Sequence, residues 1–315
     1  MGCLAACSTL PPHAQSALAK VKRRGHMDLP LMSTTIVSAQ ELSQHIDDPD
    51  WIVFDCRFTL SDPAAGKRAY EQGHIPNARY ADLNLDLSSP VTEKSGRHPL
   101  PDPAELSAKL GAWGVDSTKQ VVVYDDAFGA MAGRMWWLLR WLGHSTVAVL
   151  DGGLHSWNRS GGQLSTDSPV ITPTTFVPRQ NDGLWVGANQ VTMATQYGVV
   201  LDARAEERFL GLMEPFDKVA GHVPGARNWP FEDNLDLGGK FLSPNELREM
   251  YEGLIKDLPS EAVVHMCGSG VTACHNVLAM EIAGLPGSKL YPGSWSEWIT
   301  NPSRPVTTDE EPSCD

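Results

Sequence analysis

Basic residues are scarce in this chain of 315 residues. It contains 25 lysines and arginines against 38 aspartates and glutamates, which gives a formal net charge of −13. An excess of negative charge argues against non-specific binding to nucleic acids or to anionic membrane surfaces. Long apolar runs are also missing, since the best one, Met135 to Gly143, is interrupted by Arg140. We therefore expect neither nucleic acid nor a membrane among the partners.

Cysteine is sparse as well. The six cysteines stand at positions 3, 7, 56, 267, 274 and 314, and no two of them form a CxxC pair. So few cysteines in a chain of this length do not make a disulfide framework, which predicts a reducing, cytoplasmic compartment. The ten histidines show no HxxxH spacing and no clustering with cysteine, so we expect no metal site.

Residues 1–33 differ in composition from the rest of the chain. They hold four basic residues between positions 20 and 24 and no acidic residue before Asp28. In a secretory signal the positive charges precede the apolar stretch, whereas here they follow it. We expect a disordered N-terminal extension.

The remaining sequence contains an internal repeat. Val53–Arg57 resembles Val200–Arg204, and Gly73–Ala78 resembles Gly221–Ala226. Further matches follow in the same order: Asn84–Leu87 with Asn234–Leu237, Asp102–Leu106 with Ser243–Leu247, Gly143 with Gly284, and Trp157 with Trp298. The offset between matched residues rises from 147 to 150 and then falls to 141, which places nine additional residues of the first copy in the loop 88–101. Such an ordered series predicts two homologous domains.

The two copies have the same predicted organisation. We assign residues 34–162 to a first domain and 183–306 to a second, joined by a Thr/Pro-rich extended linker at 163–182 and followed by an acidic tail at 307–315. Short apolar runs suited to buried parallel strands are found at 52–54, 121–124, 199–201 and 262–265. Helices are expected over 132–142 and 273–283, and Asp102 and Ser243 are expected N-caps with capping boxes. The fold class is therefore α/β, with a parallel sheet covered by helices on both faces in each domain.

One feature distinguishes the copies. The strand that ends at His265 is followed by Met266 and then Cys267, and Asp126 stands where Cys267 would be in the first copy. A motif present in both copies reports the fold, whereas a feature of one copy is a better candidate for chemistry. We therefore predict one catalytic site, in the second domain, with Cys267 as its nucleophile and a non-catalytic first domain.

The surroundings of Cys267 suit a reactive sulfur. The residue lies at the carboxyl end of a parallel strand, where open α/β sheets bind ligands. Gly268 and Gly270 allow the backbone to turn successive N–H groups towards one point, and the helix from Ala273 directs its positive end there. This arrangement predicts a lowered thiol pKa and a cradle for a second anionic sulfur on Cys267. The alternative is a buried structural cysteine.

Two other cysteine chemistries fit less well. A cysteine-based phosphatase carries an arginine six residues after its cysteine, and Ala273 occupies that position here. A dithiol oxidoreductase is disfavoured because Cys274 is seven residues from Cys267. We interpret Cys274 as a helix-packing residue.

A family resemblance follows from these motifs. The loop Cys267–Thr272 with Ala273, the paired Gly-His-hydrophobic-Pro motifs and Asp151–Gly153 together resemble the tandem rhodanese family over roughly residues 34–306. Within that family the Cys-Gly-Ser-Gly-Val-Thr loop is similar to the 3-mercaptopyruvate sulfurtransferases. Thiosulfate-preferring rhodaneses usually carry basic residues directly after the cysteine, whereas Gly268 and Ser269 are neutral. By charge alone this fits a donor with one carboxylate better than the thiosulfate dianion.

The resemblance implies a covalent mechanism without a cofactor. Cys267 would take sulfane sulfur from a small anionic donor, 3-mercaptopyruvate, and become a persulfide. A thiophilic acceptor, which could be cyanide, a thiol or thioredoxin, would then remove the outer sulfur. The loop that would stabilise the persulfide consists of Gly268, Ser269, Gly270, Val271 and Thr272.

The resemblance also implies residues around the cysteine. Arg204 matches the arginine that binds the donor anion, although its repeat mate Arg57 indicates a structural alternative. Arg208 is a second candidate, with a solvated surface position as the alternative. His74 resembles a first-domain histidine linked to Ser269 and to an aspartate, for which Asp62 is the candidate. Because His222 repeats His74, both histidines could instead stabilise a turn.

Two other functions remain open at this point. One is a thiosulfate:cyanide sulfurtransferase, which would use the same nucleophile. The other is a non-enzymatic module that carries sulfur to a protein partner. Turnover with a small acceptor separates the carrier from the enzymes, and donor preference separates the two enzymes.

Overall fold

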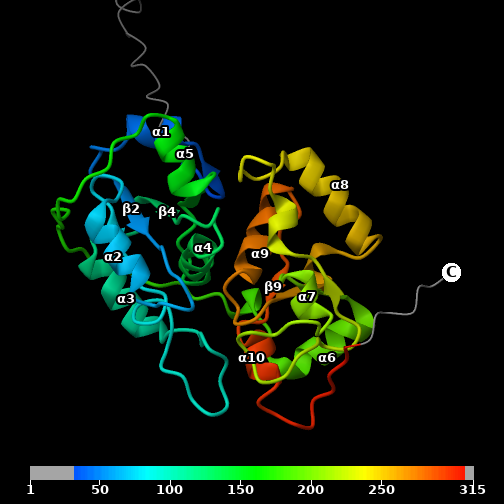
Figure 1. Cartoon of the computed structure of the whole chain (residues 1–315). Coiled ribbons are helices and arrows are strands. Elements are labelled where there is room, and N and C mark those ends of the chain that lie inside the picture. The colour runs from blue at the N-terminus through cyan, green and yellow to red at the C-terminus, as the bar shows by residue number, and fades with distance from the viewer. Residues whose placement is uncertain (1–31, 309–315) are drawn as a thin grey trace, which may run out of the picture. The chain divides into compact units, whose positions relative to one another are not determined.

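The computed structural model describes residues 32–308 and contains two parallel β-sheets (Figure 1). The first sheet has the strand order β1-β5-β4-β2-β3, and the second has the order β7-β6-β8-β9. Every pairing between these strands is parallel. The predictions for the extension at 1–33 and for the acidic tail fall almost entirely outside the described residues.

The first half of the chain alternates strands with helices. Its strands are β1 (Ile36–Val37), β2 (Trp51–Asp55), β3 (Arg79–Tyr80), β4 (Gln120–Tyr124) and β5 (Val147–Leu150). Its helices are α1 (Ala39–Gln44), α2 (Ala65–Gln72), α3 (Pro103–Ala112), α4 (Ala132–Trp141) and α5 (Gly153–Arg159).

The second half repeats this alternation with some additional short helices. Its strands are β6 (Val199–Asp202), β7 (Arg227–Asn228), β8 (Val263–Met266) and β9 (Lys289–Leu290). Its α-helices are α6 (Ala188–Tyr197), α7 (Glu206–Phe209), α8 (Pro244–Ile255), α9 (Ala273–Ile282) and α10 (Ser294–Trp298). Its 3₁₀ helices are η2 (Asp182–Leu184), η3 (Phe231–Asn234) and η4 (Ser260–Ala262).

The strand registers place apolar side chains on both faces of each sheet. In the first sheet, β2 and β4 pair from Trp51 with Gln120 to Asp55 with Tyr124. Because neighbouring residues of a strand point to opposite faces, Phe54 packs into one core and Val53 into another. Val200 and Leu201 of β6 divide in the same way. Helices cover both faces of each sheet, which confirms the predicted fold class.

A single apolar core joins the two halves. It contains one face of each sheet together with α4 and α9, which lie side by side in Figure 1. The two helices approach closely at Gly133, where an added Cβ would lie 3.2 Å from the backbone nitrogen of His275. Burial on every side explains why these two helices are apolar around most of their circumference.

Capping residues in the sequence mark the starts of helices α3 and α8. The Ser243 hydroxyl accepts a hydrogen bond from the Glu246 amide while the Glu246 carboxylate accepts one from the Ser243 amide, so the predicted capping box is present in α8. In α3 the Asp102 carboxylate accepts from the amides of Ala104 and Glu105. Each helix also has proline at its first position, where the missing N–H costs no hydrogen bond.

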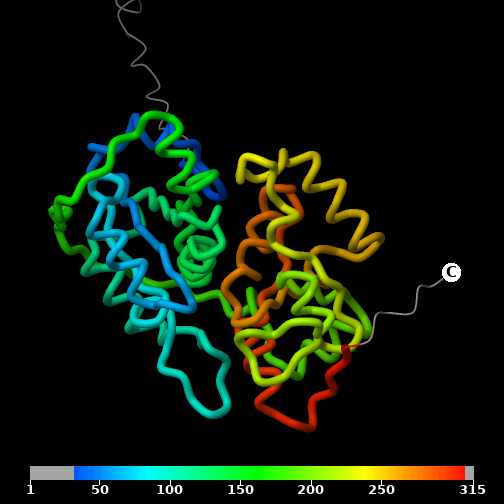
Figure 2. Tube along the Cα trace, in the orientation of Figure 1, coloured from blue at the N-terminus to red at the C-terminus, as the bar shows by residue number. Residues whose placement is uncertain are grey.

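The segment between α5 and η2 runs along the first half before the chain enters the second (Figure 2). Ser165 exchanges backbone hydrogen bonds with His74, and the Thr174 amide donates to the carbonyl of Gly111. Phe176 is buried in the shared core. The segment contains no helix or strand from 169 to 181, as expected for an extended connector, and it is held along the first half by these contacts.

Candidate functional site

The loop between β8 and α9 wraps the sulfur of Cys267. The Gly270 amide donates to Cys267 Sγ over 3.2 Å, and the amide of Cys267 donates to Ser294 Oγ over 3.0 Å. Gly270 has a φ of +75°, and a Cβ added there would lie 2.2 Å from the carbonyl oxygen of Pro292. Only glycine fits this position, and its conformation directs the amide at the sulfur.

Backbone amides in the first turn of α10 also hold the loop that follows Cys267. The amide of Trp295 donates to the carbonyl of Cys267 over 3.0 Å, and the amide of Ser296 donates to the carbonyl of Gly268 over 2.9 Å. These carbonyls are therefore turned away from the sulfur towards α10, which leaves the Gly270 amide facing it.

Cys267 lies in a small cavity of about 110 Å³ that both halves of the chain line. The first half contributes Phe58, Leu60, Leu83, Arg97, His98 and Met131. The second half contributes Arg208, Phe216, Cys267, Gly268, Ser269, Val271 and Thr272. Apolar side chains thus surround the sulfur, while the polar groups are two arginines, a histidine and two hydroxyls.

His98 contacts the persulfide loop across the boundary between the halves. Its Nδ1 lies 2.7 Å from Ser269 Oγ. Burial, together with the nearby charges of Arg134 and Arg97, lowers the pKa of His98 to about 3, so the ring is neutral near pH 7. A neutral imidazole bonded to a hydroxyl can pass a proton in either direction.

Arg134 is a buried cation behind the loop. It projects from α4 of the first half, is fully buried, and donates to the carbonyls of Gly270 over 3.0 Å and His98 over 3.1 Å. One side chain therefore fixes both the amide-bearing loop and the histidine. Burial lowers the pKa of this guanidinium, and the thiols of Cys274 and Cys267 oppose that shift because a negative sulfur nearby favours the charge.

Two further guanidinium groups lie over the loop. A Cβ added at Gly268 would lie 2.7 Å from Nη2 of Arg97 and 3.4 Å from Nη2 of Arg208. Arg208 comes from α7 and also contacts Glu214 through Nε and Nη2 at 2.9 to 3.2 Å. Arg208, one of the predicted residues, is thus placed beside Cys267 and its loop.

Arg204, predicted to bind the donor anion, lies in contacts that hold the fold together. Its side chain is 1% exposed, and it is not among the residues that line the cavity. It forms a bidentate pair with Asp202 and donates to the carbonyl of Gly221 over 2.8 Å. The repeat mate Arg57 makes the same contacts with Asp55 and the carbonyl of Gly73. Both arginines therefore tie a strand end to the following Gly-His turn.

The structure does not bring His74 and Asp62, the residues predicted to form a relay, to Ser269. His74 is buried, and its ring nitrogens lie 2.8 Å from the carbonyl of Tyr70 and 3.0 Å from that of Asp167. Asp62 is exposed and forms an ion pair with Arg68. The histidine beside Ser269 is His98, so the turn-stabilising alternative describes His74.

Cys274 packs inside α9. It is fully buried, and burial raises the pKa of its thiol to about 12. Its Sγ lies 3.4 Å from the carbonyl of Gly270. This environment agrees with the interpretation of Cys274 as a packing residue.

Arg97, His98 and Arg134 are the site residues that the sequence analysis missed. Arg97 and His98 lie in the loop 88–101, where the repeat alignment places the nine additional residues of the first copy. These nine additional residues occur in one copy only, as the cysteine does, and this difference could have indicated that the loop is functional. Arg134 carries no such signal beyond being one of two arginines in a mostly apolar helix.

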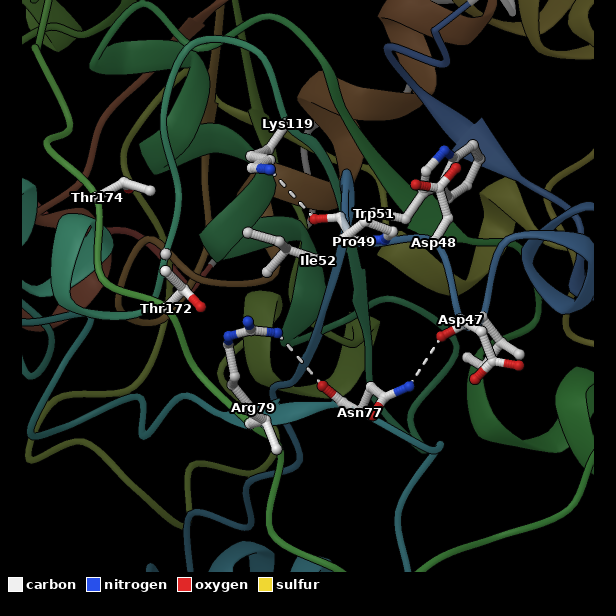
Figure 3. A pocket seen from close by; sticks show the side chains of 13 residues that line it. Asp47, Asp48, Pro49, Trp51, Ile52, Asn77, Arg79, Lys119, Thr172 and Thr174 are labelled. Atoms are coloured by element: carbon white, nitrogen blue, oxygen red, sulfur yellow. Dashed lines mark hydrogen bonds between the residues drawn. The ribbon is translucent and has the colours of Figure 1, made fainter.

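A second cavity lies in the first half (Figure 3) and has a volume of about 430 Å³. Its lining includes Asp47, Asp48, Arg79 and Lys119 but neither cysteine nor histidine. Arg79 donates to the carbonyl of Asn77 over 3.3 Å, and Lys119 forms an ion pair with Asp50. The cavity therefore lacks a nucleophile for the chemistry predicted at Cys267.

A search of residues 32–308 for a helix long and apolar enough to cross a membrane finds none.

Comparison with known proteins identifies the family. A model of the rhodanese-like domain matches twice, at residues 38–160 and 188–301. A Pseudomonas aeruginosa protein named "Probable 3-mercaptopyruvate sulfurtransferase" is 48% identical over 89% of this chain and 100% of its own length. The thiosulfate sulfurtransferase of Mus musculus is 33% identical over 84% of this chain and 91% of its own. The solved structure of 3-mercaptopyruvate sulfurtransferase from Leishmania major superposes with a TM-score of 0.74 and 30% identity, covering 84% of this chain and 74% of that one. The chain belongs to the rhodanese family, with two rhodanese-like domains in tandem.

Proposed function

We propose that this chain is a sulfurtransferase that moves sulfane sulfur from 3-mercaptopyruvate to a thiophilic acceptor through a persulfide on Cys267. The observation that carries the proposal is the loop around Cys267 Sγ, with the Gly270 amide at 3.2 Å and α9 beginning behind it. Relatives named for 3-mercaptopyruvate and for thiosulfate support sulfur transfer as the reaction.

The donor carboxylate would bind at the two arginines over the loop. Arg97 and Arg208 reach the space beside Gly268, one residue from the nucleophile. A carboxylate held there places the C3 sulfur of 3-mercaptopyruvate within reach of Cys267 Sγ. The apolar lining from Phe58, Leu83 and Met131 excludes water from the reacting sulfur atoms.

In the first step the Cys267 thiolate attacks the donor sulfur. The new S–S bond forms as the C3–S bond breaks, and the bonding pair passes to C3 to give the enolate of pyruvate. The proton lost by the donor thiol balances the proton that C3 gains. Ser269 Oγ, bonded to neutral His98, is the group placed to transfer it.

In the second step an acceptor removes the outer sulfur. Cyanide or a thiolate attacks that sulfur, the S–S bond breaks, and Cys267 leaves as a thiolate. With cyanide as the acceptor the product is thiocyanate. With a thiol or thioredoxin as the acceptor the product is a persulfide on that acceptor. The Gly270 amide and the positive end of α9 stabilise the anionic sulfur in both steps.

The test is the mass of the protein after incubation with donor. Wild-type protein with 3-mercaptopyruvate is expected to gain one sulfur atom on the peptide that contains Cys267 and to lose it when cyanide is added. Cys267→Ser is expected to gain none and to have no turnover. Cys274→Ser is the matched control, because it removes a thiol seven residues away that does not line the cavity, and it should still form the persulfide. Turnover by Cys267→Ser would refute the mechanism.

Thiosulfate is the second candidate donor, because relatives with that name share the fold and most of the chain length. Comparing kcat/KM for 3-mercaptopyruvate and thiosulfate decides between them, and equal values would remove the preference stated here. A protein that forms the persulfide but transfers it to no small acceptor would instead be a sulfur carrier.

We also place the protein in the cytoplasm. Cys56, Cys267 and Cys274, the three cysteines in the described part of the chain, are free thiols. A reducing compartment keeps such thiols unpaired.

A further inference from the structure

We propose that Asp217 determines the donor charge that this site accepts, by occupying part of the hydrogen-bonding capacity of Arg97 and Arg208 so that the pair suits a monoanion better than a dianion. The inference rests on the proposed function, since it concerns the donor class of the same site.

Asp217 connects two arginines from different halves of the chain. Its Oδ1 pairs with Nη1 of Arg97 from the loop 88–101, and its Oδ2 lies 3.2 Å from Nη2 of Arg208 from α7. The Asp217 side chain is 5% exposed, so this is a nearly enclosed carboxylate. Burial raises the pKa of Asp217, with the like charge of Glu214 adding to the shift and Arg97, Arg208 and Arg204 opposing it.

The arginines still face the nucleophile. Nη2 of both guanidiniums lies close to where a Cβ on Gly268 would be, and Nε of Arg97 is buried without a hydrogen-bond partner. A donor anion beside Gly268 can therefore bond to both groups while Asp217 retains its own side of them.

The charges of the cluster balance. Arg97, Arg204 and Arg208 carry three positive charges, and Asp202, Glu214 and Asp217 carry three negative ones. A neutral cluster offers directed hydrogen bonds to a donor but little net attraction for a second negative charge.

The main test is Asp217→Asn, which preserves the shape and adds one positive charge. A dianion gains about twice as much from that charge as a monoanion does. Over a few ångströms at the edge of a protein, we expect kcat/KM for thiosulfate to rise about tenfold relative to kcat/KM for 3-mercaptopyruvate. Both donors are measured with cyanide on one preparation, so the ratio is independent of the active fraction.

Two further variants separate charge from shape. Arg97→Gln makes the cluster negative and is expected to lower the same ratio about tenfold, which also covers the case in which Asp217→Asn does not fold. Combining Arg97→Gln with Asp217→Asn restores neutrality and should return the ratio towards the wild-type value. Asp257→Asn, at an exposed position between α8 and η4, changes the net charge equally and should leave the ratio unchanged.

The outcomes distinguish the two proposals. An unchanged ratio in Asp217→Asn, in a protein whose wild type turns over 3-mercaptopyruvate, overturns the role of Asp217 and leaves the proposed function intact. A shift of the same size in Asp257→Asn also overturns it. If the wild type forms no Cys267 persulfide from either donor, the proposed function fails first.

Discussion

Two arginines four residues apart in the second half have different environments. Arg204 is enclosed by Asp202 and the Gly221 carbonyl, and its guanidinium stacks on the ring of Trp295 at 4.8 Å. Arg208 reaches the cavity and is 15% exposed. The first is therefore enclosed by protein groups, whereas the second is open to the cavity.

This contrast predicts that the two substitutions differ in their effect on KM. Arg208→Gln removes a charged hydrogen-bond donor worth about 1.5–3 kcal/mol, so we expect KM for 3-mercaptopyruvate to rise at least tenfold. Its Tm should fall as well, because the buried carboxylates of Glu214 and Asp217 lose an ion-pair partner. Arg204→Gln leaves the Asp202 carboxylate buried without its partner and is expected to lower the free energy of unfolding by about 3–5 kcal/mol.

Steady-state kinetics and urea unfolding of both variants provide the measurement. Arg57→Gln in the first half is the matched control, since it breaks the equivalent pair with Asp55 and should destabilise without affecting KM. A raised KM in a stable Arg204→Gln protein would return that residue to the donor site.

At the scale of single residues, the internal repeat was informative only about contacts within one half of the chain. Arg57 and Arg204, like His74 and His222, occur in both copies because both copies need the same turn. The contact between His98 and Ser269 joins residues 171 apart, and nothing in either local sequence specifies it. Cys267 was a candidate because its strand, glycines and helix are contiguous, whereas in the other half only the nine additional residues of the loop 88–101 gave a signal.

Among the elements, α4 links the first half of the chain to the loop around Cys267. It packs against α9 and carries Arg134, whose guanidinium donates to the carbonyls of Gly270 and His98. The first half thus supplies a buried positive charge near Cys267 as well as part of the cavity wall.

Replacing Arg134 should therefore affect chemistry more than donor binding. Arg134→Met removes both hydrogen bonds and the charge, and we expect kcat to fall about 100-fold, corresponding to about 2.7 kcal/mol, with a smaller change in KM. We also expect alkylation of Cys267 by iodoacetamide at a fixed pH to be slower than in the wild type, because a nearby cation stabilises the reacting anionic sulfur. Arg134→Lys retains the charge and should restore part of that rate.

The control for this experiment lies on the same helix. Arg140→Met removes a partly exposed ion pair with Glu281, so its alkylation profile should match the wild type. If Arg134→Met lowers Tm but leaves the alkylation rate and kcat of the folded fraction unchanged, Arg134 has only a packing role.

The elements themselves were largely predictable. The four expected strands form within one or two residues of their predicted limits, because buried parallel strands require continuous apolar runs. The helices that begin at Asp102 and Ser243 were marked by local capping chemistry. The short strands β1, β3, β7 and β9 have two residues each and were not predicted, since pairing with a longer neighbour, not sequence pattern, defines them.

At the scale of the whole molecule, the two halves of the chain share one apolar core. A face of each sheet, α4 and α9 form one apolar cluster, so neither half buries its surface alone. The sequence indicated two domains but contained no direct signal for this interface beyond two helices that are apolar on nearly all sides. The limits 34–162 and 183–306 stay predictions, because the connecting segment itself packs on the first half.

The core also contains several uncharged histidines, which predicts a strong dependence of stability on pH. His98, His265 and His275 are at most 4% exposed, and burial lowers the pKa of each to about 3. In the unfolded chain these rings bind protons below about pH 6.5, whereas the folded protein leaves them neutral down to about pH 3. Their contribution to stability is therefore fully present above pH 6.5 and is lost as the pH falls.

The useful window is pH 6.5 to 5, since below it the aspartates and glutamates of the unfolded chain, whose ordinary pKa values are about 4, also begin to bind protons. Three protons bound only by the unfolded chain give a slope of about 4 kcal/mol per pH unit near pH 5.5. Urea unfolding at intervals across this window measures the slope.

His265→Leu should reduce the slope by about one third, because His265 is one of the three rings. The variant should still fold, because His265 Nδ1 is buried without a hydrogen-bond partner and leucine fills a similar volume. The exposed His155→Gln should leave the slope unchanged, and a stability that is flat from pH 6.5 to 5 would mean that these rings accept protons in the folded protein.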